Sequence, residues 1–247
     1  MDDEQILEFQ ANTANGIVCR LNASRRDTAV TRAIELLLGR IVGAGNSLRV
    51  LHNHAPHEFD FDGAMILRGI YDAMLQALFI LHDPAKRDER AQDYLDFYWV
   101  EKEKTIGLFD GNRTYLSRRI SQSARRPSAE PAIKQEIQRV RPRFENSNGR
   151  LRNHWYKGSL RELAGAVGFE AEYEILQQQL SGAVHASAYT LQDGSYYRGF
   201  LLLDFAWRLS FRVLGSAAEY VGIELDEAER ELVGLSRTNV FDLPNTS

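Results

Sequence analysis

This sequence has a single cysteine, no net positive charge and no long uninterrupted apolar run, and each of these shortages excludes a class of protein. Of the 247 residues only Cys19 is a cysteine, so no internal disulfide can form and a reducing compartment is expected. The formal net charge of −4 argues against non-specific nucleic-acid binding through an overall basic field. Apolar residues make up 44% and charged residues 26%, the ordinary range for a soluble globular protein.

Charged residues interrupt both of the longest apolar stretches. Arg68 and Asp72 interrupt residues 64–81, and three charged residues interrupt residues 199–218. A membrane span needs about 20 mostly apolar residues, so both stretches are expected to be buried helices. The acidic N-terminus lacks the apolar segment of a secretory signal. A cytoplasmic protein without a membrane partner is therefore predicted.

The sequence also lacks a glycine-rich phosphate loop, cysteine pairs with the spacing of zinc ligands, and the dinucleotide-binding fingerprint. No cofactor is therefore expected. His52, His54 and His57 do cluster with three acidic residues in the segment LHNHAPHEFDFDG, residues 51–63. Imidazole and carboxylate groups suit zinc, manganese or iron, but this spacing fits no motif with a defined geometry. A solvated polar loop before the next helix is favoured over a metal site.

Most of the sequence shows helical periodicity, and no strand-like alternation of useful length appears. Helices are expected over residues 3–20, 27–45, 85–107, 159–168, 170–187, 196–222 and 225–235, and another runs from a cap at Asp60 or Asp62 to about His82. The sequence therefore predicts an all-α fold: a single multi-helix, bundle-like domain that spans residues 1–247.

Helix-end signals support two of these boundaries. Asp27 is a predicted N-cap for the second helix, and Gly43 and Gly45 lie near its expected end. Ser159, with Glu162 three residues later, has the pattern of a capping box.

Residues 108–150 differ from the rest because they are rich in arginine and proline and poor in aliphatic residues. We expect a loop-rich, mobile excursion from the domain, with one short helix at about residues 131–140. Arg125 and Arg126 are candidate binding residues within it. A solvated loop is the favoured interpretation, and a contact surface for RNA or an acidic partner is the alternative.

Two polar pairs lie inside otherwise apolar helical stretches. Arg68 and Asp72 are four residues apart, as are Ser181 and His185, so each pair shares one helix face. Buried charge is costly unless it is paired, so these four residues form either a structural network or a functional site. We expect them to converge on one spot between two helices. As a nucleophile and base, Ser181 and His185 lack the turn and the glycine loop of known hydrolases.

The segments ILRGIYDAMLQALFILHDP, NHWYKGSLRELAGAVG and YEILQQQLSGAVHAS resemble the bacterial domain-of-unknown-function family 5677. The resemblance covers about residues 30–222 and implies an all-helical fold with no established activity. The family pattern falls here on Arg68, Asp72, Trp155, Tyr156, Ser181 and His185. Its acidic position is more often Glu than the shorter Asp72. Trp155 and Tyr156 are candidate binding residues, but packing anchors are favoured over base-stacking platforms.

Two classes of function fit these observations, and the sequence does not decide whether the chain is an enzyme. The first is a bacterial interaction or effector component, in a stress or phage-defence response, with a protein partner or a second copy of the chain. The alternative is a metal-independent ribonuclease of the HEPN type. Arg49 and His54 match the Arg–His spacing of that type, although Val50 stands where it favours a polar residue.

Overall fold

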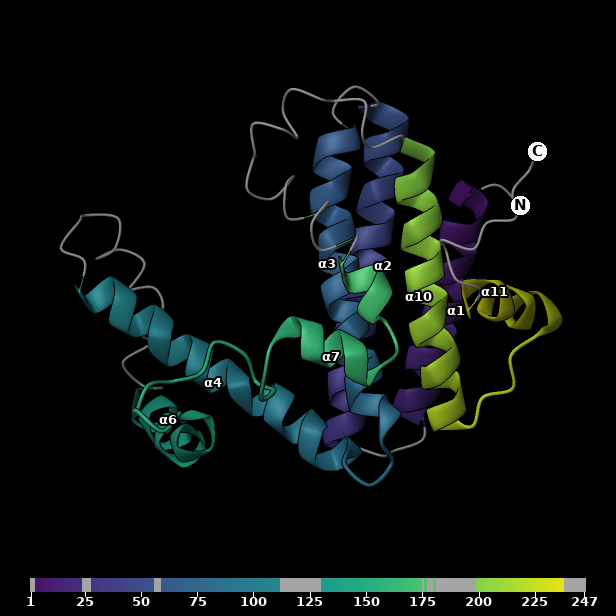
Figure 1. Ribbon diagram of the computed structural model, residues 1–247. Helices are drawn as coiled ribbons and strands as arrows, with labels where there is room; N and C mark the ends of the chain where they lie inside the picture. Colours follow the sequence, from purple (N-terminus) through teal and green to yellow (C-terminus); the bar gives the residue numbers. More distant parts are fainter. Residues whose placement is uncertain are drawn as a thin grey trace. The chain divides into compact units, whose positions relative to one another are not determined.

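The structure is a computed structural model that describes residues 3–23, 28–55, 59–111, 130–174, 176, 180 and 199–237 (Figure 1). Its helices are α1 (Asp3–Ala23), α2 (Ala29–His54), α3 (Phe59–His82), α4 (Arg87–Gly111), α6 (Glu130–Phe144), α7 (Leu160–Ala166), α10 (Gly199–Val221) and α11 (Glu227–Arg237). The described residues contain no strand, only an isolated bridge between Glu145 and Leu151. The predicted all-α fold is confirmed.

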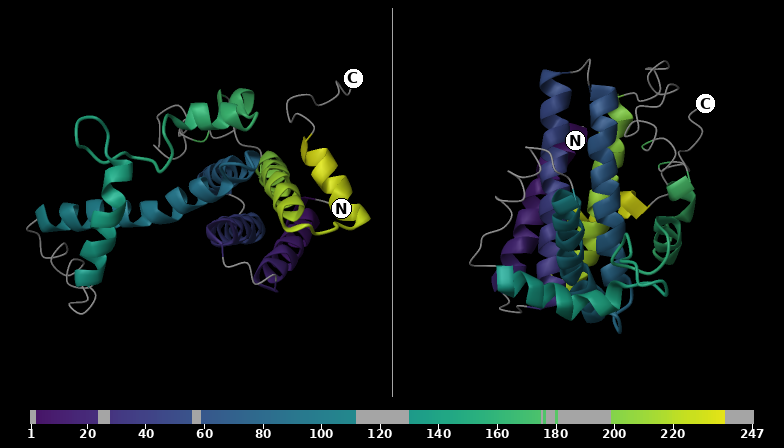
Figure 2. Two further views of the ribbon diagram at one scale, coloured as in Figure 1. Left: turned by 90° about the horizontal axis from the view of Figure 1, so that it is seen from below. Right: turned by 90° about the vertical axis from the view of Figure 1, so that its left-hand side faces the viewer.

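The chain divides into two compact units, one of residues Met1–Asp88 and Gly158–Ser247 and one of residues Glu89–Lys157. In the first unit, α1, α2, α3 and α10 lie side by side as a bundle, with α7 against α3 and α11 against α10 (Figures 1 and 2). That the whole chain forms one cooperative domain stays a prediction.

Helix α3 contributes a large part of the core of this bundle, because almost every turn of it is apolar. Ile70, Met74 and Ile80 are fully buried, and α3 packs against both α2 and α10. Among the described residues, Phe61–His82 is the one helical stretch long and apolar enough to cross a membrane, with mean hydropathy 1.5 over its best window. Since 61% of that window is buried inside the fold, packing of the bundle accounts for its apolar character.

The prediction that the second helix ends near Gly43 and Gly45 is wrong. Helix α2 runs on to His54, and α3 begins at Phe59, so most of the expected polar loop is helical. A glycine costs a helix only about 1 kcal/mol, and tertiary packing outweighs that cost here. A Cβ on Gly45 would meet the Gln10 side chain at 3.0 Å, so the glycine lets α1 approach closely.

The cap of α2 also lies one residue later than predicted. The side-chain oxygen of Thr28 accepts a hydrogen bond from the backbone N–H of Thr31 at 3.2 Å, while Asp27 lies outside the described residues. The predicted capping box of α7 is confirmed. Ser159 accepts from the Glu162 backbone, and the Glu162 carboxylate accepts from the Ser159 backbone N–H at 2.6 Å.

The second unit is built from α4 and α6. Helix α6 covers Glu130–Phe144 and is longer than the helix predicted at residues 131–140, because Pro142 falls in its last turn and does not end it. Val140 and Phe144 are fully buried, and the Phe144 ring packs edge-on against Phe97 of α4 at 5.3 Å. The expected mobility of residues 108–150 stays a prediction, and residues 112–129 lie outside the described part of the chain.

Candidate functional site

The first predicted polar pair is present as an ion pair on α3. Arg68 Nε donates to Asp72 Oδ1 at 2.9 Å, and the two side chains are 15% and 38% exposed. The backbone carbonyl of Asp72 also accepts from the Gln76 amide at 3.1 Å. Their spacing on one helix face therefore brings Arg68 and Asp72 together, at the edge of the core and not deep within it.

A buried tyrosine lies next to this pair. Tyr71 is fully buried, and its hydroxyl has no hydrogen-bond partner among the described residues. Burial raises the pKa of Tyr71, Arg68 partly opposes this, and Glu172 and Asp72 add to it. Glu172 is itself only 7% exposed and belongs to the helical residues 170–174 that follow α7. The polar surroundings of Arg68 and Asp72 on α3 thus include Glu172, which belongs to a second segment of the first unit.

Four other candidate residues, Ser181, His185, Arg125 and Arg126, lie outside the described residues. Their convergence with Arg68 and their role in binding stay predictions. Trp155 and Tyr156 are 5% and 7% exposed, and the Trp155 ring packs edge-on against Tyr94 at 5.7 Å. Burial of this kind favours packing over base stacking for both residues.

Of the histidine cluster near the end of α2, His52 and His54 lie within the described residues, and His57 and Glu58 lie outside them. The His52 ring packs edge-on against Phe59 at 4.9 Å, and His54 is an exposed residue in the last turn of α2. Arg49 is paired with Glu8 of α1 at 3.2 Å. Within the described part of the chain no three His, Cys, Asp or Glu side chains are grouped closely enough to hold a metal ion.

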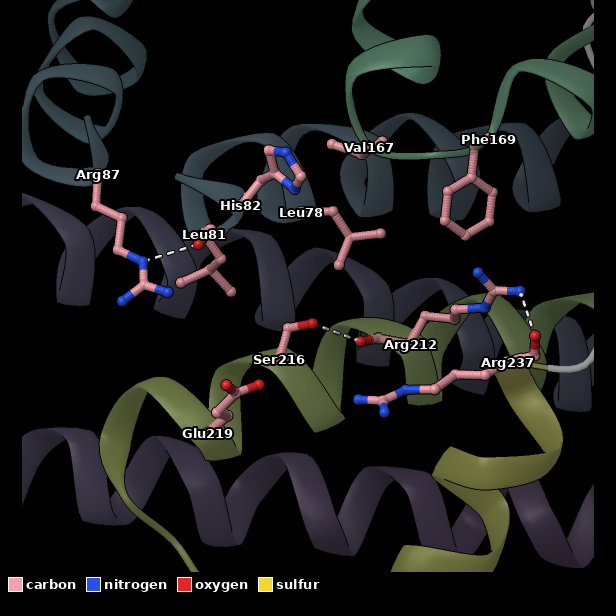
Figure 3. A pocket seen from close by; sticks show the side chains of 10 residues that line it. All are labelled: Leu78, Leu81, His82, Arg87, Val167, Phe169, Arg212, Ser216, Glu219 and Arg237. Atoms are coloured by element: carbon pink, nitrogen blue, oxygen red, sulfur yellow. Dashed lines mark hydrogen bonds between the residues drawn. The ribbon is translucent and has the colours of Figure 1, made fainter. Parts of the chain in front are cut away.

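A pocket of about 360 Å³ opens in the first unit, at the side of α10 that faces the ends of α3 and α7 (Figure 3). Its apolar lining consists of Leu78, Leu81, Val167 and Phe169. Its polar lining consists of His82, Arg87, Arg212, Ser216, Glu219 and Arg237. Three arginines and one glutamate leave this lining with a net charge of +2 when His82 is neutral.

Arg212 is held firmly at one end of the pocket. Its Nε donates to the Ser236 carbonyl at 2.5 Å, and its guanidinium lies over the Phe169 ring, 4.4 Å from the centroid. Burial lowers the pKa of Arg212, Glu172 partly opposes this, and the nearby charge of Arg237 lowers it further.

Arg87 lies at the opposite end of the pocket (Figure 3). Its Nε donates to the Leu81 carbonyl at 2.8 Å, and its guanidinium packs against the Tyr220 ring at 5.4 Å. Within the described ranges, neither Arg87, Arg212 nor Arg237 forms an ion pair with a carboxylate. Three guanidinium charges around one cavity can attract and orient an anion.

One feature of the sequence could have indicated this pocket: an arginine in an apolar helix without an acidic residue at helical spacing. Arg208 of α10 has an acidic partner four residues earlier and pairs with Asp204 at 2.9 Å. Arg212, in the same apolar helix, has no acidic residue three or four positions away on either side. An arginine without a helical partner in a buried helix indicates a partner elsewhere or a ligand. Arg87 and Arg237 join it only through the fold.

Comparison with known proteins gives one match. A model described as a family of unknown function (DUF5677) matches residues 32–196. The matched range contains the pair on α3, whereas α10 and α11 lie beyond it and supply Arg212 and Arg237 to the pocket. It ends earlier than the resemblance over residues 30–222 suggested. No curated protein and no solved structure matches.

Proposed function

We propose that this chain, which belongs to the family of unknown function DUF5677, is an interaction or effector component that binds a small anionic ligand in the arginine-lined pocket. The observation that carries this proposal is the set of three pocket arginines without a carboxylate partner among the described residues. In this proposal, ligand binding acts as the signal, and the helical bundle presents the liganded pocket to a partner.

The energetics of the pocket support an anion as its ligand. A half-buried guanidinium loses part of its hydration, and backbone carbonyls restore only part of it, so a bound anion would stabilise Arg212. A cavity of about 360 Å³ is at the lower end of the range for small-molecule sites. Leu78, Leu81 and Val167 add a smaller apolar part to a lining that is mainly polar, as binding of a charged group requires.

Thermal unfolding in phosphate tests the proposal. Inorganic phosphate should raise the melting temperature above that in chloride at equal ionic strength. A ligand at about 100 times its Kd stabilises the folded state by about 2.7 kcal/mol. Arg87→Gln and Arg212→Gln should each reduce this stabilisation, and Arg161→Gln should retain it. Arg161 is a suitable control because it lies on α7 in the same unit and pairs with Glu174 at the surface.

Equal responses to phosphate and chloride in the parent protein would refute anion binding at this pocket. Loss of the phosphate response in Arg161→Gln to the same extent as in Arg87→Gln would show a non-specific charge effect, which also contradicts the proposal.

The biological setting belongs to the proposal as well. We propose a bacterial cytoplasmic component of a stress or phage-defence response, with a protein partner or a second copy of the chain that responds to the liganded form.

A metal-independent HEPN-like ribonuclease is the second candidate, and the accessibility of His54 at the end of α2 is what favours it. RNA cleavage without a metal uses a positioned acid or base, so cleavage should require His54 or His185. The test is incubation with labelled single-stranded RNA, beside His54→Ala and His185→Ala. Cleavage that both variants retain would exclude these roles, and absence of cleavage by the parent would exclude the activity.

A further inference from the structure

Two of the three guanidinium groups of the pocket lie at opposite ends, and the third lies between them. Arg212 lies under Phe169 at one end, Arg87 lies at the other end, and the Arg237 side chain reaches from the Arg212 side toward the middle of the pocket (Figure 3). Leu78 and Ser216 lie between these ends. We call these the Arg212 end and the Arg87 end. One compact anion cannot contact both ends at once.

The spacing of the two ends follows from the geometry of α10. Arg87 packs against Tyr220, which lies eight residues after Arg212. At about 1.5 Å per residue, this places the two anchoring positions about 12 Å apart along the axis of α10. Each guanidinium is fixed by a backbone carbonyl and an aromatic ring, so the distance between the ends is set before any ligand binds.

The rest of the lining offsets part of this positive charge. Glu219 lines the pocket on α10, and its carboxylate forms no ion pair with a described residue. Leu78 and Leu81 provide apolar surface, and Ser216 and His82 can form hydrogen bonds. The net lining charge of +2 matches a ligand with two negative charges, one at each end.

We infer that the ligand is an elongated molecule with an anionic group, phosphate or carboxylate, at each terminus. This inference rests on the proposed function, because it specifies the ligand of the same pocket. Two anionic groups on one chain bind as a bivalent ligand. Binding at one end holds the second group at a high effective concentration near the other end, but only if the chain is long enough.

A length series of diphosphonates tests the inference with the full chain. Calorimetric titration would compare α,ω-alkanediphosphonates, from methylenediphosphonate to decanediphosphonate, with inorganic phosphate and butylphosphonate. Affinity should rise steeply at the length that spans both ends, and the best diphosphonate should bind at least about tenfold more tightly than butylphosphonate. Arg87→Gln and Arg212→Gln should each reduce it to the level of the monophosphonate, and Arg161→Gln should not.

The outcomes separate the inference from the proposed function. If phosphate binds but all diphosphonates bind equally, the two-ended ligand is wrong while the anion site stands. If no anion binds, both are wrong. Since Arg212 also holds α11 through the Ser236 carbonyl, Arg87→Gln decides the matter should Arg212→Gln unfold. A length dependence that persists in Arg87→Gln would overturn the inference.

Discussion

The arginines of the second unit and those of the pocket in the first unit have opposite surroundings. In the second unit, Arg139 and Arg143 both donate to Asp96, a carboxylate that is 5% exposed, and Arg141 pairs with Glu103 and Glu145. In the pocket, Arg87 and Arg212 are held by backbone carbonyls and aromatic rings, and their charges face a cavity.

This difference separates arginines that build structure from arginines that are available for a ligand. A guanidinium shared with a buried carboxylate fixes the packing of α4 against α6, and its charge is neutralised within the unit. A guanidinium that is oriented by carbonyls keeps its full charge in a fixed place, as anion recognition requires. Local arginine content does not distinguish the two cases, but the identity of the hydrogen-bond acceptor does.

The largest expected effect concerns the apolar core on which the pocket is built. Phe211→Ala should lower the free energy of unfolding by about 3–5 kcal/mol, because the ring is fully buried beside Phe9 and Trp207. Chemical denaturation followed by tryptophan fluorescence measures the change. Leu36→Ala is the control, since that side chain is 59% exposed and its loss should change stability by less than about 0.5 kcal/mol. Similar losses for both variants would contradict the assignment of the core.

The second effect concerns the shared carboxylate of the second unit. Asp96→Asn should destabilise this unit by about 1.5–3 kcal/mol, because Arg139 and Arg143 lose a common charged acceptor. Hydrogen exchange of α4 and α6 amides measures the loss locally, with exposed Glu101→Gln as the control. Unchanged exchange would mean that the ion pairs contribute nothing, and the contrast between the two sets of arginines would fail.

The third effect is the pH dependence of the same carboxylate. Burial alone would raise the pKa of Asp96, but hydrogen bonds from Arg139, Gln92 and Arg143 outweigh burial and lower it. In the unfolded chain the pKa of this carboxyl is about 4, and in the folded protein it is lower. The contribution of Asp96 to stability is therefore fully present above about pH 4 and is lost as the pH falls through its pKa in the folded protein. Burial raises the pKa of Asp93, which acts in the opposite sense.

Urea denaturation from neutral pH to about pH 2 would measure this dependence, with Asp96→Asn beside the parent protein. The difference between the two isolates Asp96, because Asp93 contributes to both. The stability of the parent should approach that of the variant as the pH falls. Parallel curves at all pH values would contradict the role of Asp96.

The smallest effect concerns the short helix before Val167 and Phe169 of the pocket. Ser159→Ala removes the confirmed capping box of α7 and should cost about 1 kcal/mol. Hydrogen exchange at the first amides of α7 measures it. Ser47→Ala is the control, because the Ser47 hydroxyl only adds a bond to the Gly43 carbonyl within α2. A larger loss in Ser47→Ala than in Ser159→Ala would contradict the role of the cap.

Local features of the fold could be predicted from the sequence wherever adjacent residues decide them. The capping box of Ser159 and the pair of Arg68 and Asp72 depend on spacings of three and four residues, which a helix fixes by itself. The end of α2 could not be predicted in this way. Gly45 weakens a helix in isolation but permits close packing against Gln10 of α1, which is a tertiary effect.

The pocket could not be predicted for the same reason. Arg87, Arg212 and Arg237 come from three different helices, and no spacing rule joins positions so far apart in sequence. The close approach of α10 and α11 also depends on one small residue. A Cβ on Gly215 would lie 2.7 Å from Val233 Cγ1, so the glycine lets α11 pack closely against α10. Only the folded bundle brings these cations together around one cavity.

Nuclear magnetic resonance of the arginine Nε–Hε groups during a phosphate titration compares both sets of arginines in one sample. The resonances of Arg87 and Arg212 should shift and saturate, while those of Arg139, Arg141 and Arg143 should stay in place because carboxylates already neutralise them. Small, non-saturating shifts of all arginines, or saturating shifts confined to the second unit, would contradict the claim that the pocket is an anion-binding site.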